Sequence, residues 1–204
     1  GTFANVFGSG TITVTDCYSS GAISAGNAGG IFAQEANGSS GATMIVTNCY
    51  STGAISGGNA GGIFGLGANN NRYGYSNDTR SITVENCYSV GAISGENVGG
   101  IFGSRANGYQ TDNTATETPP PNAKITVKNS YSYGAITGTL AGGIYGPTNA
   151  TDEVNSVTGK LPTVTNCYVA NGVWHDIGDN DQNEAIYKSA AEAGLSLTDS
   201  NDSV

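Results

Sequence analysis

The fold is decided by residues 12–24, ITVTDCYSSGAIS, which are followed at 29–32 by Gly-Gly-Ile-Phe. The same order of residues returns at 46–65, 82–103 and 125–146, and a shortened copy, TVTNCY, occupies 163–168. Self-similarity with a period of about 20 to 50 residues is typical of solenoids and propellers, in which one small unit is repeated and stacked. The chain is therefore predicted to be a stack of similar units.

Each copy predicts three short strands, Ile-Thr-Val, Gly-Ala-Ile-Ser and Gly-Gly-Ile-Phe, separated by Gly and Asn. Strands this short cannot bury a face alone, but stacking lets each one pair with its equivalent in the next coil, about 4.8 Å away. Alternation then turns the isoleucines and valines inward and Thr13, Ala22 and Ser24 outward. The sequence predicts an all-β fold, a short β-solenoid (β-helix), expected to be right-handed because that is the commoner hand.

The domain organisation follows from where the copies differ. Residues 1–172 are expected to form a β-solenoid of about five coils whose insertions all follow the Gly-Ile-Phe-Gly element and so leave from one corner. The insertions occupy 33–43, 66–80, 104–124 and 147–160. Residues 173–204 are expected to form an acidic capping segment with a short helix, because Asp181 and Glu184 make a capping box and Gly194 ends the apolar pattern.

The composition excludes several classes of function. The 204 residues include 32 Gly but only 7 Lys and Arg, the charged fraction is 11%, and the net charge is −9. Nucleic-acid binding needs a basic stripe that so few cations cannot make. No apolar run is long enough to span a membrane. Ser, Thr, Asn and Gly can hydrate a surface without charged groups, and such surfaces are typical of secreted and cell-surface β proteins. We therefore expect an extracellular or cell-surface location.

The recurring Asn-Cys-Tyr-Ser-x-Gly, followed by Gly-Gly-Ile-Phe-Gly, resembles the GLUG motif over most of residues 1–170. The resemblance implies a relation to bacterial surface adhesins and to the non-catalytic repeat regions of immunoglobulin A peptidases. It also implies that the chain is an extracellular module with an adhesive role. Departures are the Ile-Phe in place of the more usual Leu-Val and the long insertions rich in Asn and Thr.

One face of the predicted solenoid carries small, uncharged side chains. Its members are Ala22, Ser24, Ala54, Ser56, Ala92, Ser94, Ala135 and Thr137. Such a face is either a tolerated β surface, a packing face for assembly into a fibre, or an ice-binding plane. A second plane, the Thr13 column, is expected to be interrupted by Ile45, Glu85 and Lys128.

The insertions carry a second candidate edge, which pairs cations with aromatic rings. Its members are Arg72, Tyr73, Tyr75, Arg105 and Tyr109. These side chains could stack on sugars, pack on a host or substrate surface, or fold back on their own loops. Four N-glycosylation sequons begin at Asn37, Asn77, Asn149 and Asn201.

The four cysteines, Cys17, Cys49, Cys87 and Cys167, hold the same place in different copies, with Ser130 in the fourth copy. Stacked parallel side chains rarely reach disulfide torsions, so a ladder of buried thiols is expected in preference to disulfides. No Cys-x-x-Cys pair or neighbouring His completes a metal site. Oxygen ligands for Ca²⁺ would come from Asp176, Asp179 and Asp181, but these lack EF-hand spacing, so we expect no cofactor.

Catalysis is not expected either. A polysaccharide-degrading β-helix needs two or three carboxylates converging on one face, whereas the copies supply Asp16, Glu85 and Glu96 at different registers. His175 is the sole histidine. We therefore predict a non-catalytic extracellular module that acts in cell-surface attachment or as a self-assembling fibre subunit, whose partners are further copies, neighbouring repeats or glycans. The alternatives are an ice-binding protein and a polysaccharide-active enzyme.

Overall fold

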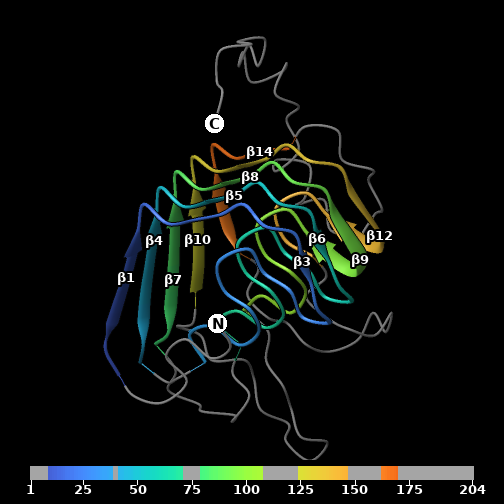
Figure 1. Cartoon of the computed structure of the whole chain (residues 1–204). Coiled ribbons are helices and arrows are strands. Elements are labelled where there is room, and N and C mark those ends of the chain that lie inside the picture. The colour runs from blue at the N-terminus through green and yellow to red at the C-terminus, as the bar shows by residue number, and fades with distance from the viewer. Residues whose placement is uncertain (1–8, 39–40, 71–78, 108–123, 147–161, 170–204) are drawn as a thin grey trace, which may run out of the picture.

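The computed structural model describes residues 9–38, 41–70, 79–107, 124–146 and 162–169, and these wind into a β-solenoid (Figure 1). All their regular structure is strand, and no helix occurs among them. Every strand pairs in parallel with its equivalent one coil away, which gives three sheets that run along the solenoid. The predicted all-β solenoid is confirmed. The capping segment predicted at 173–204 lies outside the described residues.

The three sheets follow one another around each coil. Sheet A consists of β1 (Thr11–Thr15), β4 (Thr43–Thr47), β7 (Ser81–Glu85), β10 (Lys124–Lys128) and β13 (Thr163–Thr165). Sheet B consists of β2 (Tyr18–Ser19), β5 (Tyr50–Ser51), β8 (Tyr88–Ser89), β11 (Tyr131–Ser132) and β14 (Tyr168–Val169). Sheet C consists of β3 (Ile23–Ser24), β6 (Ile55–Ser56), β9 (Ile93–Gly99) and β12 (Ile136–Gly142). We number the coils 1 to 5 by the sheet A strand that begins each.

The core is a set of columns in which one apolar residue type stacks on itself. Met44, Ile82 and Ile125 face inward from consecutive sheet A strands and are all but fully buried. The Phe32, Phe64 and Phe102 rings form another column, with centroids 4.8 and 4.5 Å apart and nearly parallel planes. Each coil therefore closes the apolar interior of its neighbour, as expected for a fold whose units cannot bury their own faces.

The third predicted strand is not a strand, and a different segment takes its place. The Gly-Gly-Ile-Phe elements are joined by single parallel backbone pairs, such as Gly29 with Gly61 and Phe32 with Phe64. A Cβ on Gly62 would lie 2.1 Å from the Gly100 carbonyl oxygen and 2.4 Å from the Ser89 Cβ. The backbone there is therefore in close contact with the next coil, both at the equivalent glycine and at Ser89 of sheet B. The Tyr-Ser dipeptides, which the sequence did not single out, form sheet B instead.

The predicted insertions begin too early, because their first residues are a regular part of the coil. Turns at 34–37, 66–69 and 104–107 each end in Ala-Asn, and the alanines and asparagines are buried. Asn37, Asn69 and Asn107 have φ of 59° or 60°, a left-handed conformation in which Asn is enriched. The Asn37 Nδ2 donates to the Asn69 Oδ1 at 2.9 Å, and the Asn69 Nδ2 donates to the Asn107 Oδ1 at 2.7 Å. This buried asparagine ladder is a fourth side of the coil.

The close approach at Gly62 can be tested by a pair of substitutions in coil 2. Gly62→Ala should lower the free energy of unfolding by about 3 kcal/mol, at the upper end of the range for overpacking, because backbone and not a flexible side chain meets the new Cβ. Gly58→Ala is the matched control, since its Cβ would meet only the Gly26 carbonyl oxygen at 3.5 Å. Chemical denaturation measures both, and equal losses in the two variants would contradict the packing described here.

Candidate functional site

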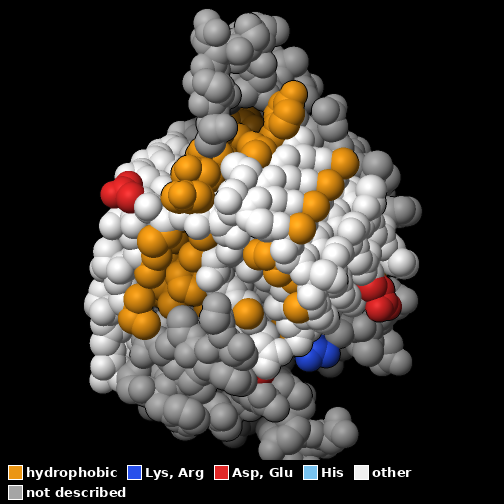
Figure 2. Space-filling model, in the orientation of Figure 1, with side chains coloured by type: hydrophobic (Ala, Val, Ile, Leu, Met, Phe, Trp, Pro, Cys, Tyr) orange, Lys and Arg blue, Asp and Glu red, His pale blue; other side chains and the backbone are white. Residues whose placement is uncertain are grey.

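The surface of the solenoid is organised in columns, because in-register pairing places equivalent residues of successive coils side by side. The eight small residues predicted as a flat face lie along sheet C, where the Ala22, Ala54, Ala92 and Ala135 side chains are all exposed. Ser24, Ser94 and Thr137 are also exposed, and Ser56 is half-buried. Figure 2 shows hydrophobic side chains in narrow bands between polar ones, with charged side chains few and far apart. The structure thus assembles this face, and whether it binds anything stays a prediction.

The threonine plane on sheet A is more regular than the sequence suggested. Thr13 is in register with Ile45, Thr83, Thr126 and Thr163. Glu85 and Lys128 do not interrupt that column, and this expectation was wrong. They belong to the neighbouring column, which is formed by Thr15, Thr47, Glu85, Lys128 and Thr165. The error arose because alternation assigns a face but does not say which residues of one face share a column.

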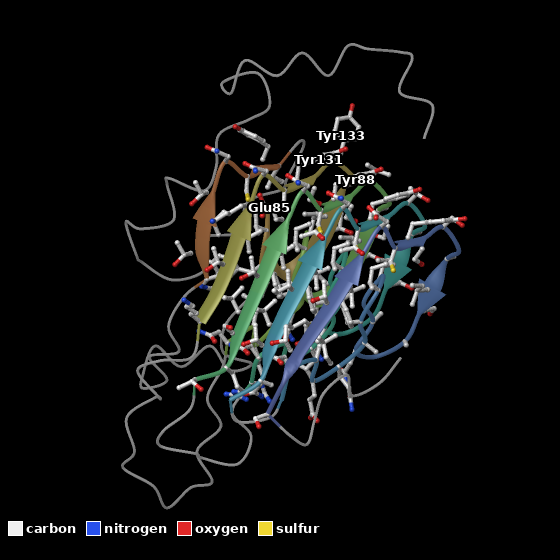
Figure 3. The ribbon with its side chains drawn as sticks, turned by 90° about the vertical axis from the view of Figure 1, so that its left-hand side faces the viewer. Glu85, Tyr88, Tyr131 and Tyr133 are labelled. Atoms are coloured by element: carbon white, nitrogen blue, oxygen red, sulfur yellow. The ribbon has the colours of Figure 1, made fainter. Side chains whose placement is uncertain are left out.

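A tyrosine column runs along the outer face of sheet B. The rings of Tyr18, Tyr50, Tyr88 and Tyr131 stack with centroids 4.8 to 5.3 Å apart and planes within 11° of parallel. Figure 3 places Tyr88 and Tyr131 next to each other at the upper edge of the solenoid, with Tyr133 beside them. Because each ring covers the face of the next, the interior tyrosines present only edges and hydroxyl groups. The first ring, Tyr18, is 65% exposed.

The corner between sheets A and B needs a left-handed residue in every coil. Asp16, Asn48, Asn86, Asn129 and Asn166 occupy it, with φ between 48° and 55°. Their exposed side chains form a second, surface asparagine ladder in which the amides of Asn48, Asn86 and Asn166 donate to the preceding coil. The donor–acceptor distances are 3.1 Å from Asn48 Nδ2 to Asp16 Oδ1, 3.4 Å from Asn86 Nδ2 to Asn48 Oδ1, and 3.3 Å from Asn166 Nδ2 to Asn129 Oδ1. The ladder has a direction, because each of these amides donates toward coil 1.

The cysteine column completes the same corner and is a ladder of free thiols. The Cys87 Sγ donates to the Glu85 carbonyl oxygen, two residues back, and accepts a hydrogen bond from the Cys49 N–H at 3.4 Å. The Ser130 hydroxyl in coil 4 takes both roles, since it donates to the Lys128 carbonyl oxygen and accepts from the Cys87 N–H. A thiol or a hydroxyl satisfies this corner equally. Burial of the whole column was expected, but Cys17 is exposed, because no described coil precedes it.

Burial raises the pKa of the three buried thiols, which favours their protonated form. The pKa of Cys87 is raised from 9.0 to about 12, mainly because burial penalises the thiolate, and the hydrogen bond from the Cys49 backbone opposes this only in part. Burial also raises the pKa of Cys49 and of Cys167. Reactive or metal-binding cysteines have a lowered pKa, so the column has the properties of a structural element.

Of the predicted loop edge, the structure describes Arg105, which is half-buried in the second position of an Ala-Asn turn. Arg72, Tyr73, Tyr75 and Tyr109 lie outside the described residues, as do the sequons at Asn77, Asn149 and Asn201 and the carboxylates of Asp176, Asp179 and Asp181.

The sequon at Asn37 is corrected by the structure. The Asn37 side chain is 0% exposed, and its amide nitrogen donates to Asn69 and to the Ser81 carbonyl oxygen. That nitrogen is the atom to which a glycan would be attached, and a glycan there would leave no room for the buried ladder. Glycosylation at this position is therefore incompatible with the fold.

Among the described residues, no three His, Cys, Asp or Glu side chains gather where they could hold a metal ion. The coil carboxylates lie apart, with Asp16 at the corner in coil 1, Glu85 at the end of β7 in sheet A and Glu96 on β9 in sheet C. Within the same residues, no helix has the length and hydropathy needed to cross a membrane.

Comparison with known proteins gave one similar solved structure. The crystal structure of a "putative immunoglobulin A1 protease" from Bacteroides ovatus is 26% identical over 89% of this chain, with a TM-score of 0.47. The match covers 51% of that protein, so this chain spans about half of its length. No family model matches the sequence. No curated protein matches it either.

The cysteine column predicts how stability depends on pH. Because the pKa of Cys87 is higher in the folded protein than the ordinary 9.0, its contribution is fully present below pH 9 and is lost as the pH rises toward 12. The loss should approach about 1.4 kcal/mol per pH unit, the effect of one proton. Cys87→Ser, which copies Ser130, should make the pH dependence of the unfolding free energy shallower between pH 9 and 12.

Reactivity gives an independent check, because Cys17 is exposed in the folded protein and Cys87 is buried. In the native protein a thiol reagent should modify Cys17 alone. Modification of Cys87 in the folded protein, or an identical pH profile for Cys87→Ser and wild type, would contradict the structural role.

Proposed function

We propose that the chain is a non-catalytic structural module of an extracellular or cell-surface protein, and that it displays its loop edge and its uncharged faces for attachment. One observation carries this proposal. In the described coils the buried groups Cys49, Cys87, Ser51, Ser89, Ser130 and Asn69 form hydrogen bonds that hold one coil on the next. What the coils leave free is a regular surface, which suits a scaffold.

The sequence motifs support the same interpretation. Asn-Cys-Tyr-Ser-x-Gly together with Gly-Gly-Ile-Phe-Gly resembles the GLUG motif of adhesins and of the non-catalytic repeats of immunoglobulin A peptidases. The motif residues are those that form the asparagine corner, the thiol ladder, the tyrosine column and the close glycine contacts. The motif residues are therefore used to stack one coil on the next. Residues outside the motif have to supply the specificity for a partner.

The loop edge is the part of the sequence that differs most between copies. In the sequence, Arg72 directly precedes Tyr73, and Arg105 comes four residues before Tyr109. The flat rings and hydroxyl groups of tyrosines suit sugars. A chain with 11% charged residues offers few other groups for a specific contact. Glycans of a cell or matrix surface are therefore the partner that we propose.

Replacement of Tyr73, Tyr75 and Tyr109 by Ala should reduce binding of the whole chain to a glycan array or to intact cells by about tenfold or more, the usual effect of losing an aromatic anchor. Tyr133→Ala is the matched control, because Tyr133 is 44% exposed but directly follows β11 of sheet B and is not part of the loop edge. Its binding should equal that of the wild type. If wild-type protein binds no cell and no glycan, the attachment role is wrong.

A second candidate function, ice binding, is favoured by the sheet C face. Its eight small residues are uncharged, aligned in register and all at least partly exposed. Sheet A is a weaker candidate plane because Glu85 and Lys128 stand beside its threonine column.

Ice crystals grown in the presence of the protein test this second candidate. If sheet C binds ice, the wild type should produce faceted crystals, and Ala92→Lys should abolish the faceting because a long, hydrated cation stands off the plane. Thr83→Lys, in the same coil on sheet A, is the matched control and should keep the faceting. Crystals of ordinary shape at high concentrations of wild-type protein would eliminate ice binding.

A further inference from the structure

We propose that two copies of this chain pair through the outer face of sheet A, about a two-fold axis that runs along the strands between β7 and β10. The inference goes beyond the attachment role, which concerns the loop edge and the uncharged faces. The occupant of the face is a second copy because the charged residues of sheet A are complementary to one another under that axis.

The outer face of sheet A is a five-stranded surface that no other described segment covers (Figure 3). Its side chains are half-buried or exposed, whereas the alternate residues of β4, β7 and β10 point into the core and are buried. Most of the outward residues are threonines. The charged residues of the five strands all lie on this face, with Glu85 at the end of β7 and Lys124 and Lys128 at the two ends of β10.

Two of these charges are neighbours of opposite sign. Glu85 and Lys128 share one column, because β7 and β10 pair in parallel and in register. The same pairing places Lys124 beside Ser81, at the other end of the two strands. Glu85 is half-buried and Lys128 is exposed, so both side chains are accessible from outside. Adjacent opposite charges on one face form a pattern that a second copy of the same face can match.

A two-fold axis along the strands, midway between β7 and β10, exchanges these two strands. In such an isologous contact one surface meets its own copy, and every contact is made twice. Glu85 would lie opposite the partner's Lys128, and Lys128 opposite the partner's Glu85. Lys124 would face the partner's Ser81, which is uncharged. Two pairs of opposite charges therefore form in this arrangement, and no like charges meet.

The other simple arrangement, with the two-fold axis along the solenoid, is opposed by the lysines. That axis would pass through the middle of the strands and place each strand on its own equivalent in the opposite direction. Lys124 would then face the partner's Lys128 twice, and like charges opposite each other at an interface cost free energy. The positions of the charges therefore favour the axis along the strands, in which the two sheets pack in the aligned manner.

The size of the face predicts a weak contact. The pairing covers β4, β7, β10 and β13, an area of roughly 19 Å by 16 Å at ordinary strand dimensions. Stable complexes bury about 800 Å² of accessible surface on each partner, which is more than a face of this size offers. We therefore expect a reversible dimer that forms at high protein concentration and weakens as salt screens the two charge pairs.

The test compares the association of wild-type protein with that of two charge reversals, Glu85→Lys and Lys128→Glu. Each variant places like charges opposite each other at both symmetric contacts, so its dimerisation constant should fall by about tenfold or more. Sedimentation equilibrium at concentrations up to the millimolar range measures this. Mixed in equal amounts, the two variants should form a heterodimer with the affinity of the wild type, because every contact then joins opposite charges. Recovery in the mixture also shows that both variants are folded.

Two controls distinguish this contact from a general effect of charge. Glu96→Lys makes the same change in net charge as Glu85→Lys, but on β9 of sheet C, and should associate like the wild type. Lys124→Glu lies on β10 but faces the partner's uncharged Ser81, so it should also associate like the wild type. A monomeric wild type, no recovery in the mixture, or an equal loss in Glu96→Lys would overturn the proposal. A gain in Lys124→Glu would overturn it as well, because that result indicates the axis along the solenoid.

Discussion

The structure depends on one constraint, which is that in-register parallel stacking brings each residue next to its own equivalent in the following coil. The side chains that tolerate this are those that attract their own kind. Phenylalanine and tyrosine rings stack, asparagine amides both donate and accept, serine and cysteine do the same, and isoleucine packs on isoleucine. Like charges opposite each other repel. The charged fraction of only 11% is therefore a consequence of the stacking itself.

The corners obey the same constraint with an added conformational one. A coil that turns sharply places a residue in the left-handed region, where Gly, Asn and Asp are least strained. Asn serves at both the buried and the surface corner because its side chain also continues a ladder. The cysteine that follows the surface corner binds the carbonyl two residues back. In the Asn-Cys-Tyr-Ser run, the Asn forms the corner, the Cys binds a backbone carbonyl across it, and Tyr-Ser forms the next strand.

Much of the fold could be predicted from the sequence because a repeated motif directly indicates a stack of equivalent coils. The parallel solenoid, the inward aliphatic columns and the exposed Ala22 and Ser24 positions follow from copy number and alternation. The buried Ala-Asn turn was missed because it is short and adjoins segments of unequal length, so it looked like the start of an insertion. The glycosylation site was wrongly predicted at Asn37 for the same reason, because Asn37 belongs to this buried turn and not to an insertion. Strand character at Gly-Gly-Ile-Phe was overestimated because close contact with sheet B of the next coil depends on the closed coil, which no local pattern contains.

The surface sites were harder to predict because a motif that specifies stacking carries little information about partners. Register decides which side chains share a column, and register is a property of pairs of coils; this is why Glu85 was assigned to the wrong column. The same reasoning explains the residue types of the surface asparagine ladder. A side chain that links the coils on both of its sides must donate to one neighbour and accept from the other, as Asn48 does when it donates to Asp16 and accepts from Asn86. An amide meets this requirement because it carries a donor and an acceptor on the same group.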